Sequence, residues 1–265
     1  MIPFDVIARS EATKQSQSIR NFKLILEYDG VDFKGWQIQK NGERTVQGEL
    51  ERACSIIFKH DVKVIASGRT DSGVHAQGQV VHFKADTRMK PVEIQKALNS
   101  RLPADIAIIE AQEVPADFHA QYSVKEKTYC YTILNRPYRS AFLRQYAHFY
   151  PYPLNVGLMR KAAKFLVGKH DFRSFQAHDP LRADRDTVRT IKRLRVIKAG
   201  ELVHIEVTAN GFLYKMVRNI VGTLISVGGT HIPATQVLKI LKAKDRGKAC
   251  DTAPAQGLTL ISVKY

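Results

Sequence analysis

The chain has 265 residues, 44% of them hydrophobic and 25% charged, which is typical of a folded globular protein with one large domain or two modest ones. Its 41 Lys and Arg residues outnumber 25 Asp and Glu residues, so at a net charge of +16 we expect a polyanionic partner such as nucleic acid; a generically basic, solvated surface is the alternative. Three scattered cysteines without a CxxC pair argue against a disulfide framework or a zinc site, and no apolar run is long enough to span a membrane.

The N-terminal segment does not have the pattern of a signal peptide. Asp5 interrupts its short apolar start, and the stretch 10–20 is polar and charged. We therefore expect residues 1–20 to form a poorly ordered tail, and we expect the protein in the reducing cytoplasm, without a membrane partner.

The first half of the chain alternates predicted strands and helices. β-branched and alternating residues predict strands over 22–28, 62–67, 79–85 and 106–114. Helical periodicity predicts a helix over 46–58, with Thr45 as its N-cap, and a short helix that begins at Pro91.

The second half repeats this alternation. Strands are predicted over 127–134, 190–197, 202–209 and 258–264, and helices over 155–167, 212–227 and 233–241. Two antiparallel sheets with helices on one face predict an α+β fold, in which a basic cleft separates an N-terminal half (21–115) from a C-terminal half (124–265).

A glycine-hinged turn follows the predicted strand over 62–67. Gly68 ends the strand, and Gly73 lets the backbone turn, so Asp71 is held between rigid neighbours with Arg69 two residues away. Catalytic side chains need such fixed placement. Taken alone, an Asp before Ser-Gly is more often the cap of a turn through its own backbone.

Arg218 is the basic residue that could meet this carboxylate. It lies three residues after Lys215, on one face of the helix predicted over 212–227, and Asn210-Gly211 immediately precedes that helix. Arg218 could reach Asp71 from the other half and aim it, although a solvated charged edge is the commoner fate of such a pair.

Aromatic and basic residues are interleaved along the second half. Tyr129 and Tyr131 alternate on one face of a predicted strand, where they are either core residues or a platform on which a nucleobase stacks. The surrounding cations suit a phosphate backbone, and either DNA or RNA would satisfy them. They are Lys125, Lys127, Arg136, Arg139, Arg144, Arg182, Arg185, Arg189, Lys192, Arg193 and Arg195.

A metal site of Asp71, His75 and His82, as in a nuclease, is a weaker alternative, because no second cluster of carboxylates lies nearby. Walker, GxGxxG, GxSxG and HExxH motifs are absent from the sequence, which leaves nucleotide-hydrolysing, dinucleotide-binding, serine-hydrolase and zincin chemistry without a motif.

Taken together, these motifs resemble the tRNA pseudouridine synthase A family, in order, over roughly residues 22–264. Ser72 stands where alanine is usual, and the N-terminal tail lies outside the resemblance. The matching strings are GRTDSGVHA (68–76), QVVHF (79–83), DFHA (117–120), NGFL (210–213), MVRNI (216–220), AP (253–254) and GL (257–258).

The resemblance implies isomerisation of uridine to pseudouridine in the anticodon stem-loop of tRNA, at positions 38, 39 and 40, without a metal or cofactor. It makes Asp71 the nucleophile, Arg218 its partner and Tyr129 the residue that stacks on the flipped-out base, with Arg69 in contact with RNA. It further implies RRM-like or ferredoxin-like halves and a homodimer. A noncatalytic RNA-binding protein of similar build is the alternative, but the RRM signature is missing.

Overall fold

The computed structural model describes residues 19–178 and 186–265. Residues 1–18 of the predicted tail, together with Arg182 and Arg185, lie outside the described residues.

The strands are β1 (Arg20–Tyr28), β2 (Ile65–Ala66), β3 (His75–Ala85), β4 (Ile106–Val114), β5 (Glu126–Leu134), β6 (His148–Phe149), β7 (Gly168–Asp171), β8 (Val188–Ala199), β9 (Leu202–Ala209) and β10 (Leu258–Lys264). The helices are α1 (Val46–Phe58), α2 (Pro91–Asn99), α3 (Val156–Lys164), α4 (Met216–Gly228) and α5 (Gln236–Ala243), with short 3₁₀ turns η1 (Arg173–Phe175), η3 (Arg246–Lys248) and η4 (Ala255–Gly257).

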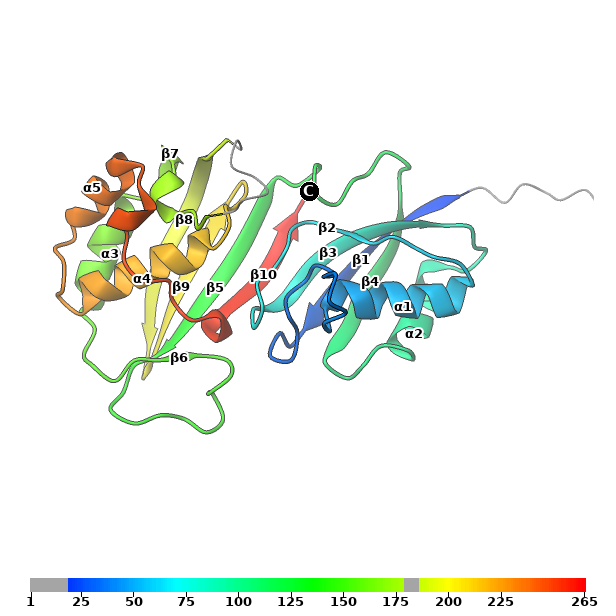
Figure 1. Cartoon of the computed structure of the whole chain (residues 1–265), viewed down its shortest axis with the longest axis horizontal. Coiled ribbons are helices and arrows are strands. Elements are labelled where there is room, and N and C mark those ends of the chain that lie inside the picture. The colour runs from blue at the N-terminus through cyan, green and yellow to red at the C-terminus, as the bar shows by residue number, and fades with distance from the viewer. Residues whose placement is uncertain (1–18, 179–185) are drawn as a thin grey trace, which may run out of the picture.

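The predicted α+β fold is confirmed, and the strands of its two parts are joined. Within the described ranges, ten strands form one sheet whose main path has the order β4-β1-β3-β10-β5-β9-β8-β7. β10 pairs antiparallel with β5 on one side and parallel with β3 on the other. Figure 1 shows β10 between the part that carries α1 and α2 and the part that carries α3, α4 and α5. The exact division into halves at 115–124 stays a prediction.

Alternation of buried and solvent-facing residues explains the central strands. Phe22, Leu24 and Leu26 of β1 are fully buried, at every second position, because successive side chains point to opposite faces of a sheet. α1 begins where its cap predicts: the Thr45 side chain accepts a hydrogen bond from Gly48 N–H.

Strand β2 is much shorter than the predicted strand over 62–67. Val62 and Val64 are buried, which accounts for the apolar pattern, but the Val64 N–H donates to the Glu51 carboxylate at 2.9 Å. A side chain therefore satisfies a backbone donor that a longer strand would have satisfied in the ladder. The next strand, β3, begins at His75 and so extends further toward the glycine turn than predicted.

The predicted start of α4 at Phe212 is wrong, because the helix begins at Met216. Lys215 has a left-handed backbone conformation (φ 56°) and precedes the first helical turn. Lys215 and Arg218 are therefore not two residues of one helical face. The apolar residues Phe212 and Leu213 continue the helical pattern into an irregular segment that precedes the helix.

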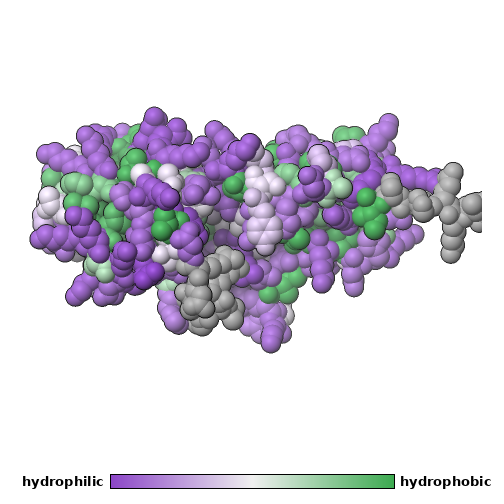
Figure 2. All heavy atoms as spheres, turned by 90° about the horizontal axis from the view of Figure 1, so that it is seen from above, coloured by the Kyte–Doolittle hydropathy of each residue, from purple (hydrophilic) through white to green (hydrophobic). Residues whose placement is uncertain are grey.

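The outer surface carries no extended apolar face in the view of Figure 2, where hydrophilic residues surround small separate groups of apolar ones. None of the helices in residues 19–178 and 186–265 is long and apolar enough to cross a membrane.

One close backbone contact fixes α4 against the segment that leads to β10. A Cβ atom on Gly222 would lie 1.8 Å from the carbonyl oxygen of Asp251. The neighbouring Ala253 N–H donates to the Arg218 carbonyl at 3.1 Å. Glycine at position 222 thus allows the helix to approach this segment at backbone distance.

We expect Gly222→Ala to lower the free energy of unfolding by about 1 to 3 kcal/mol, because the clashing atom belongs to the backbone and must move. Urea denaturation monitored by circular dichroism measures the change. The control is Ser226→Ala, one turn further along α4, which removes only the bond to the Gly222 carbonyl (3.1 Å). Equal, small effects of the two substitutions would contradict the close-packing explanation.

Candidate active site

Asp71 lies in the turn between β2 and β3, and the turn is anchored on both sides of it. Before Asp71, the Thr70 carbonyl accepts from Trp36 N–H (3.1 Å), and the Thr70 hydroxyl lies 2.8 Å from the Tyr28 hydroxyl. After Asp71, the Ser72 hydroxyl donates to the Phe33 carbonyl at 3.1 Å. Ser72, which stands where the family that the sequence resembles usually has alanine, therefore adds one hydrogen bond that anchors the turn.

Two glycines give the turn its shape. Gly73 has φ +76°, a conformation that favours glycine, and the Asp71 carbonyl accepts from Val74 N–H at 3.1 Å. Gly35 has φ +89°, and a Cβ there would lie 2.8 Å from the Thr70 carbonyl oxygen. The carboxylate thus projects from a backbone that has little freedom to move.

Arg218 pairs with Asp71, which the residues alone left open and the family resemblance implied. Its Nη1 donates to Asp71 Oδ2 at 2.7 Å, and its Nε donates to the Ala253 carbonyl, also at 2.7 Å. The side chains are largely removed from solvent, with 14% of Arg218 and 21% of Asp71 exposed. Since a guanidinium donates in a fixed plane, these two bonds together orient the carboxylate.

Tyr129 is a buried residue that also lines the cleft. Only 8% of it is exposed, and its ring packs edge-on against Phe212 with centroids 5.1 Å apart. Burial, and secondarily the nearby Tyr28 and Asp71 side chains, raise the pKa of the Tyr129 phenol well above its ordinary value. The hydroxyl is thus a neutral group that can donate a hydrogen bond, and it is poorly suited to act as a phenolate base.

The strand order explains how Tyr129 comes near the turn. Leu260 of β10 pairs with Ala76 of β3 on one side and with Tyr129 of β5 on the other. Two strand spacings of about 4.8 Å therefore separate the start of β3 from Tyr129.

These residues surround a cleft of about 1200 Å³, which is large enough for a small organic group such as a nucleotide. Its walls include Arg69, Asp71, Lys127, Tyr129, Arg189 and Arg218. Arg69 is exposed beside Asp71. All four residues predicted for the site, Asp71, Arg218, Tyr129 and Arg69, thus lie around one cleft, while their roles stay predictions.

Four of the other basic positions fall into two groups. Lys127 and Arg189 line the cleft. Lys192 and Arg136 instead form ion pairs with Glu126 (2.5 Å) and Glu201 (2.7 Å), away from it.

The histidines of the alternative metal site have other partners. His75 Nδ1 lies 3.0 Å from Gly30 N and 3.1 Å from an Asp29 carboxylate oxygen, and its Nε2 lies 2.9 Å from the Gln145 carbonyl. His82 Nδ1 accepts from Ala120 N–H at 3.1 Å. In the part of the chain that the structure describes, there is no cluster of three or more His, Cys, Asp or Glu residues arranged to hold a metal ion.

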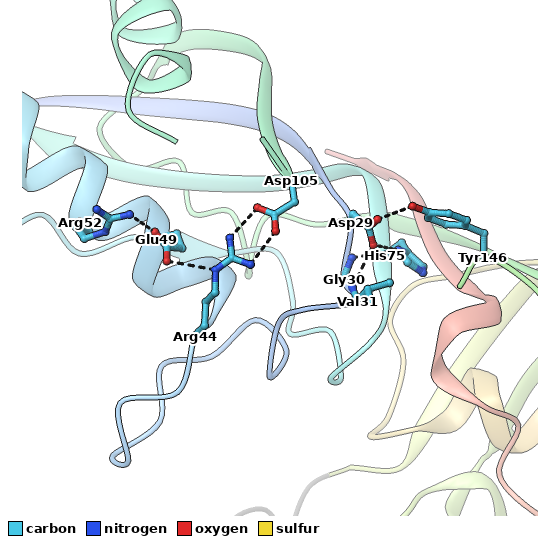
Figure 3. A network of polar contacts seen from close by, with 9 residues as sticks. All are labelled: Asp29, Gly30, Val31, Arg44, Glu49, Arg52, His75, Asp105 and Tyr146. Carbon is cyan, nitrogen blue, oxygen red and sulfur yellow. Dashed lines mark hydrogen bonds and ion pairs between the residues drawn. The ribbon is translucent and has the colours of Figure 1, made fainter. Parts of the chain in front are cut away.

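His75 belongs to a polar network that supports the far end of the turn. Figure 3 shows Asp29 between His75 and Tyr146, whose hydroxyl donates to the Asp29 carboxylate at 2.6 Å. In the same figure Arg44 joins Glu49 to Asp105, with two bonds of 2.7 and 2.9 Å to Asp105. The network holds the segment 29–45, which contains Phe33 and Trp36, two of the residues that anchor the turn carrying Asp71.

Two contributors to the geometry of the cleft, the Ala253 carbonyl and Lys127, were not singled out from the sequence. The Ala253 carbonyl, which fixes Arg218, is a backbone atom, and an Ala-Pro pair gives no chemical sign of its role. Lys127 was included only among the dispersed cations. Its spacing of two from Tyr129, which puts both on one face of a strand, was the available signal.

Comparisons with known proteins agree with this arrangement. The model of a family described as tRNA pseudouridine synthase matches residues 24–123 and 162–265. The protein named tRNA pseudouridine synthase A from Thermoanaerobacter sp. (strain X514) is 46% identical over 247 residues, which cover 93% of this chain and 100% of that protein. The protein of the same name from Halalkalibacterium halodurans is 48% identical over 242 residues, covering 91% and 90%.

Among solved structures, the archaeal box H/ACA sRNP Nop10-Cbf5 complex aligns with a TM-score of 0.35 and 11% identity over 77% of this chain and 44% of that chain, which is too weak to define the fold. The match of the family model, together with the high identity over nearly the whole length of these relatives, is decisive. The chain belongs to the tRNA pseudouridine synthase family, and it is an isomerase.

Proposed function

We propose that this isomerase converts uridine to pseudouridine in the anticodon stem-loop of tRNA, at positions 38, 39 and 40, with Asp71 as the nucleophile. The observation that carries the proposal is the Asp71–Arg218 ion pair of 2.7 Å, set in the wall of a cleft that Tyr129 also lines. A net charge of +16 supports RNA as the partner that the cleft receives.

The base must first leave the helix, because the reacting atoms of a stacked uridine are out of reach. Tyr129 stacks on the flipped base, and Arg69 contacts the RNA at the entrance. Asp71 then attacks either C1′ of the ribose or C6 of the base. In the first case the carboxylate bonds to C1′ and the N1–C1′ bond breaks. After the base rotates, C5 bonds to C1′, the carboxylate leaves, and the C5 proton is replaced by a proton at N1.

The remaining parts of the proposal concern the assembly. A homodimer in the cytoplasm, with one tRNA spanning both subunits, is what the family resemblance implies. The reaction as proposed breaks and forms bonds within one nucleotide, so it requires no oxidant or reductant, and the family resemblance implies no metal or cofactor.

The decisive substitution is Asp71→Asn. Asparagine keeps the shape and can still cap the turn, but its amide has no negative charge with which to attack, so turnover should fall below detection. Release of C5 tritium from labelled tRNA measures turnover, and filter binding should show unchanged or slightly tighter tRNA binding. The control is Asp32→Asn on the neighbouring exposed loop, which should keep full activity. Turnover of Asp71→Asn within tenfold of wild type would refute the mechanism.

Arg218→Ala tests the aiming of the carboxylate. We expect turnover to fall by about 100-fold, because a displaced reactive group is costly, while tRNA affinity changes little. Arg218→Lys keeps the charge but cannot donate to Asp71 and to the Ala253 carbonyl in one plane, so it should restore only part of the rate. Equal and modest losses of rate and affinity would make Arg218 an RNA backbone contact instead.

Tyr129→Phe and Tyr129→Leu separate stacking from hydroxyl chemistry. Phe keeps the ring, so tRNA affinity should be retained, and a loss of rate would assign a role to the hydroxyl. Leu fills much of the space without a π face and should weaken tRNA binding by about 1 to 3 kcal/mol. Thermal unfolding verifies that both variants are folded. If the folded Leu variant bound and reacted like wild type, Tyr129 would be a core residue only.

A further inference from the structure

Lys127 places an ammonium group in the cleft, and the reaction as proposed gives this group no role. It lies on β5 two residues before Tyr129, so both side chains project from the same face of the strand, about 7 Å apart along it. Both line the cleft that contains Asp71.

The Lys127 ammonium reaches across to the catalytic turn. Its Nζ donates to the Ser67 carbonyl at 2.5 Å, immediately before the turn that carries Asp71. A Cβ on Gly68 would lie 2.5 Å from the same Nζ. The position of the amine therefore depends on glycine at position 68.

The charge of this ammonium is not compensated. Among residues 19–178 and 186–265 no carboxylate forms an ion pair with Lys127, and its hydrogen-bond partner is a neutral carbonyl. Burial in the first place, and the nearby Arg189 of β8 in the second, lower the pKa of the Lys127 amine to about 8. Both effects disfavour the cation in the free protein, and an anion placed in the cleft would reverse them.

We propose that the Lys127 ammonium binds a phosphate of the RNA backbone, that of the target nucleotide itself, inside the cleft beside Asp71 and Tyr129. This inference rests on the proposed function. A base stacked on Tyr129 brings its own sugar and phosphate to the neighbouring position on the same face of β5. A lysine ammonium has three donors, and Ser67 occupies one of them, so two remain for phosphate oxygens.

A purely structural role makes a different prediction. If Lys127 served only to hold the Ser67 carbonyl, its loss would loosen the turn and slow the chemical step without changing the number of phosphates contacted. A phosphate ligand instead affects the binding of tRNA and its dependence on salt.

The test is Lys127→Met in steady-state tritium release over a series of salt concentrations. We expect KM for tRNA to rise about tenfold, kcat to stay within about threefold, and the slope of log affinity against log salt to become shallower by about 0.7 to 0.9, the value for one phosphate. Lys127→Arg should restore the salt slope, because it keeps a cation. The control is Lys198→Met, exposed at the other end of β8 about 30 Å from Arg189, which should change none of these quantities.

Gly68→Ala provides an independent variant that retains the lysine. Its added methyl group displaces the amine, so KM should rise as in Lys127→Met even if that variant does not fold. A fall in kcat at constant KM and salt slope would overturn the proposal and leave Lys127 as a support for the turn. Unchanged kinetics in both variants would overturn it as well. Failure of wild type to release tritium would instead refute the proposed function.

Discussion

Pairing of β10 with strands on both of its sides is the constraint on which the arrangement of the site depends. Because Leu260 lies between Ala76 and Tyr129, the hydrogen-bond ladder sets the distance from the start of β3, next to the turn that carries Asp71, to Tyr129 in the wall of the cleft. Spacing between hydrogen-bonded strands varies by only a few tenths of an ångström. The distance between side chains that lie far apart in the sequence is thereby fixed by the spacing of the strands.

The residues just before β10 position Arg218. Ala253 forms one hydrogen bond with the backbone of Arg218 and another with its guanidinium, and Gly222 lets α4 approach close enough for both. A stretch of about ten residues, from Asp251 to Leu260, therefore controls Asp71, Tyr129 and Arg218 together. A small displacement of this stretch would change the positions of all three side chains. We therefore expect a substitution in it to affect the whole site and not one residue alone.

Much of this could be predicted from sequence where local chemistry decides the outcome. The bounds of α1, with its Thr45 cap, and those of β4 and β10 follow from periodicity and capping. The residues left the pairing of Arg218 with Asp71 open beside a solvated charged edge, and the family resemblance implied the pairing that the structure shows. The start of α4 could not be predicted in the same way, because Phe212 and Leu213 continue an apolar pattern that the left-handed backbone of Lys215 interrupts. The joining of the two sheets and the Ala253 carbonyl also escaped prediction, since strand partners and backbone acceptors are decided by tertiary packing.

The position of β10 in the chain has a consequence for folding in the cell. Its partner β3 is made early, and the paired residues His75 and Thr259 are separated by most of the protein. During synthesis, the start of β3 at His75 and Ala76 therefore lacks its β10 partner until Thr259 and Leu260 have left the ribosome, and an unpaired edge invites association with other chains. Contacts of such long range also form slowly. Nascent chains of this protein thus pass through an interval in which the start of β3 lacks one strand partner, and this interval ends when β10 docks.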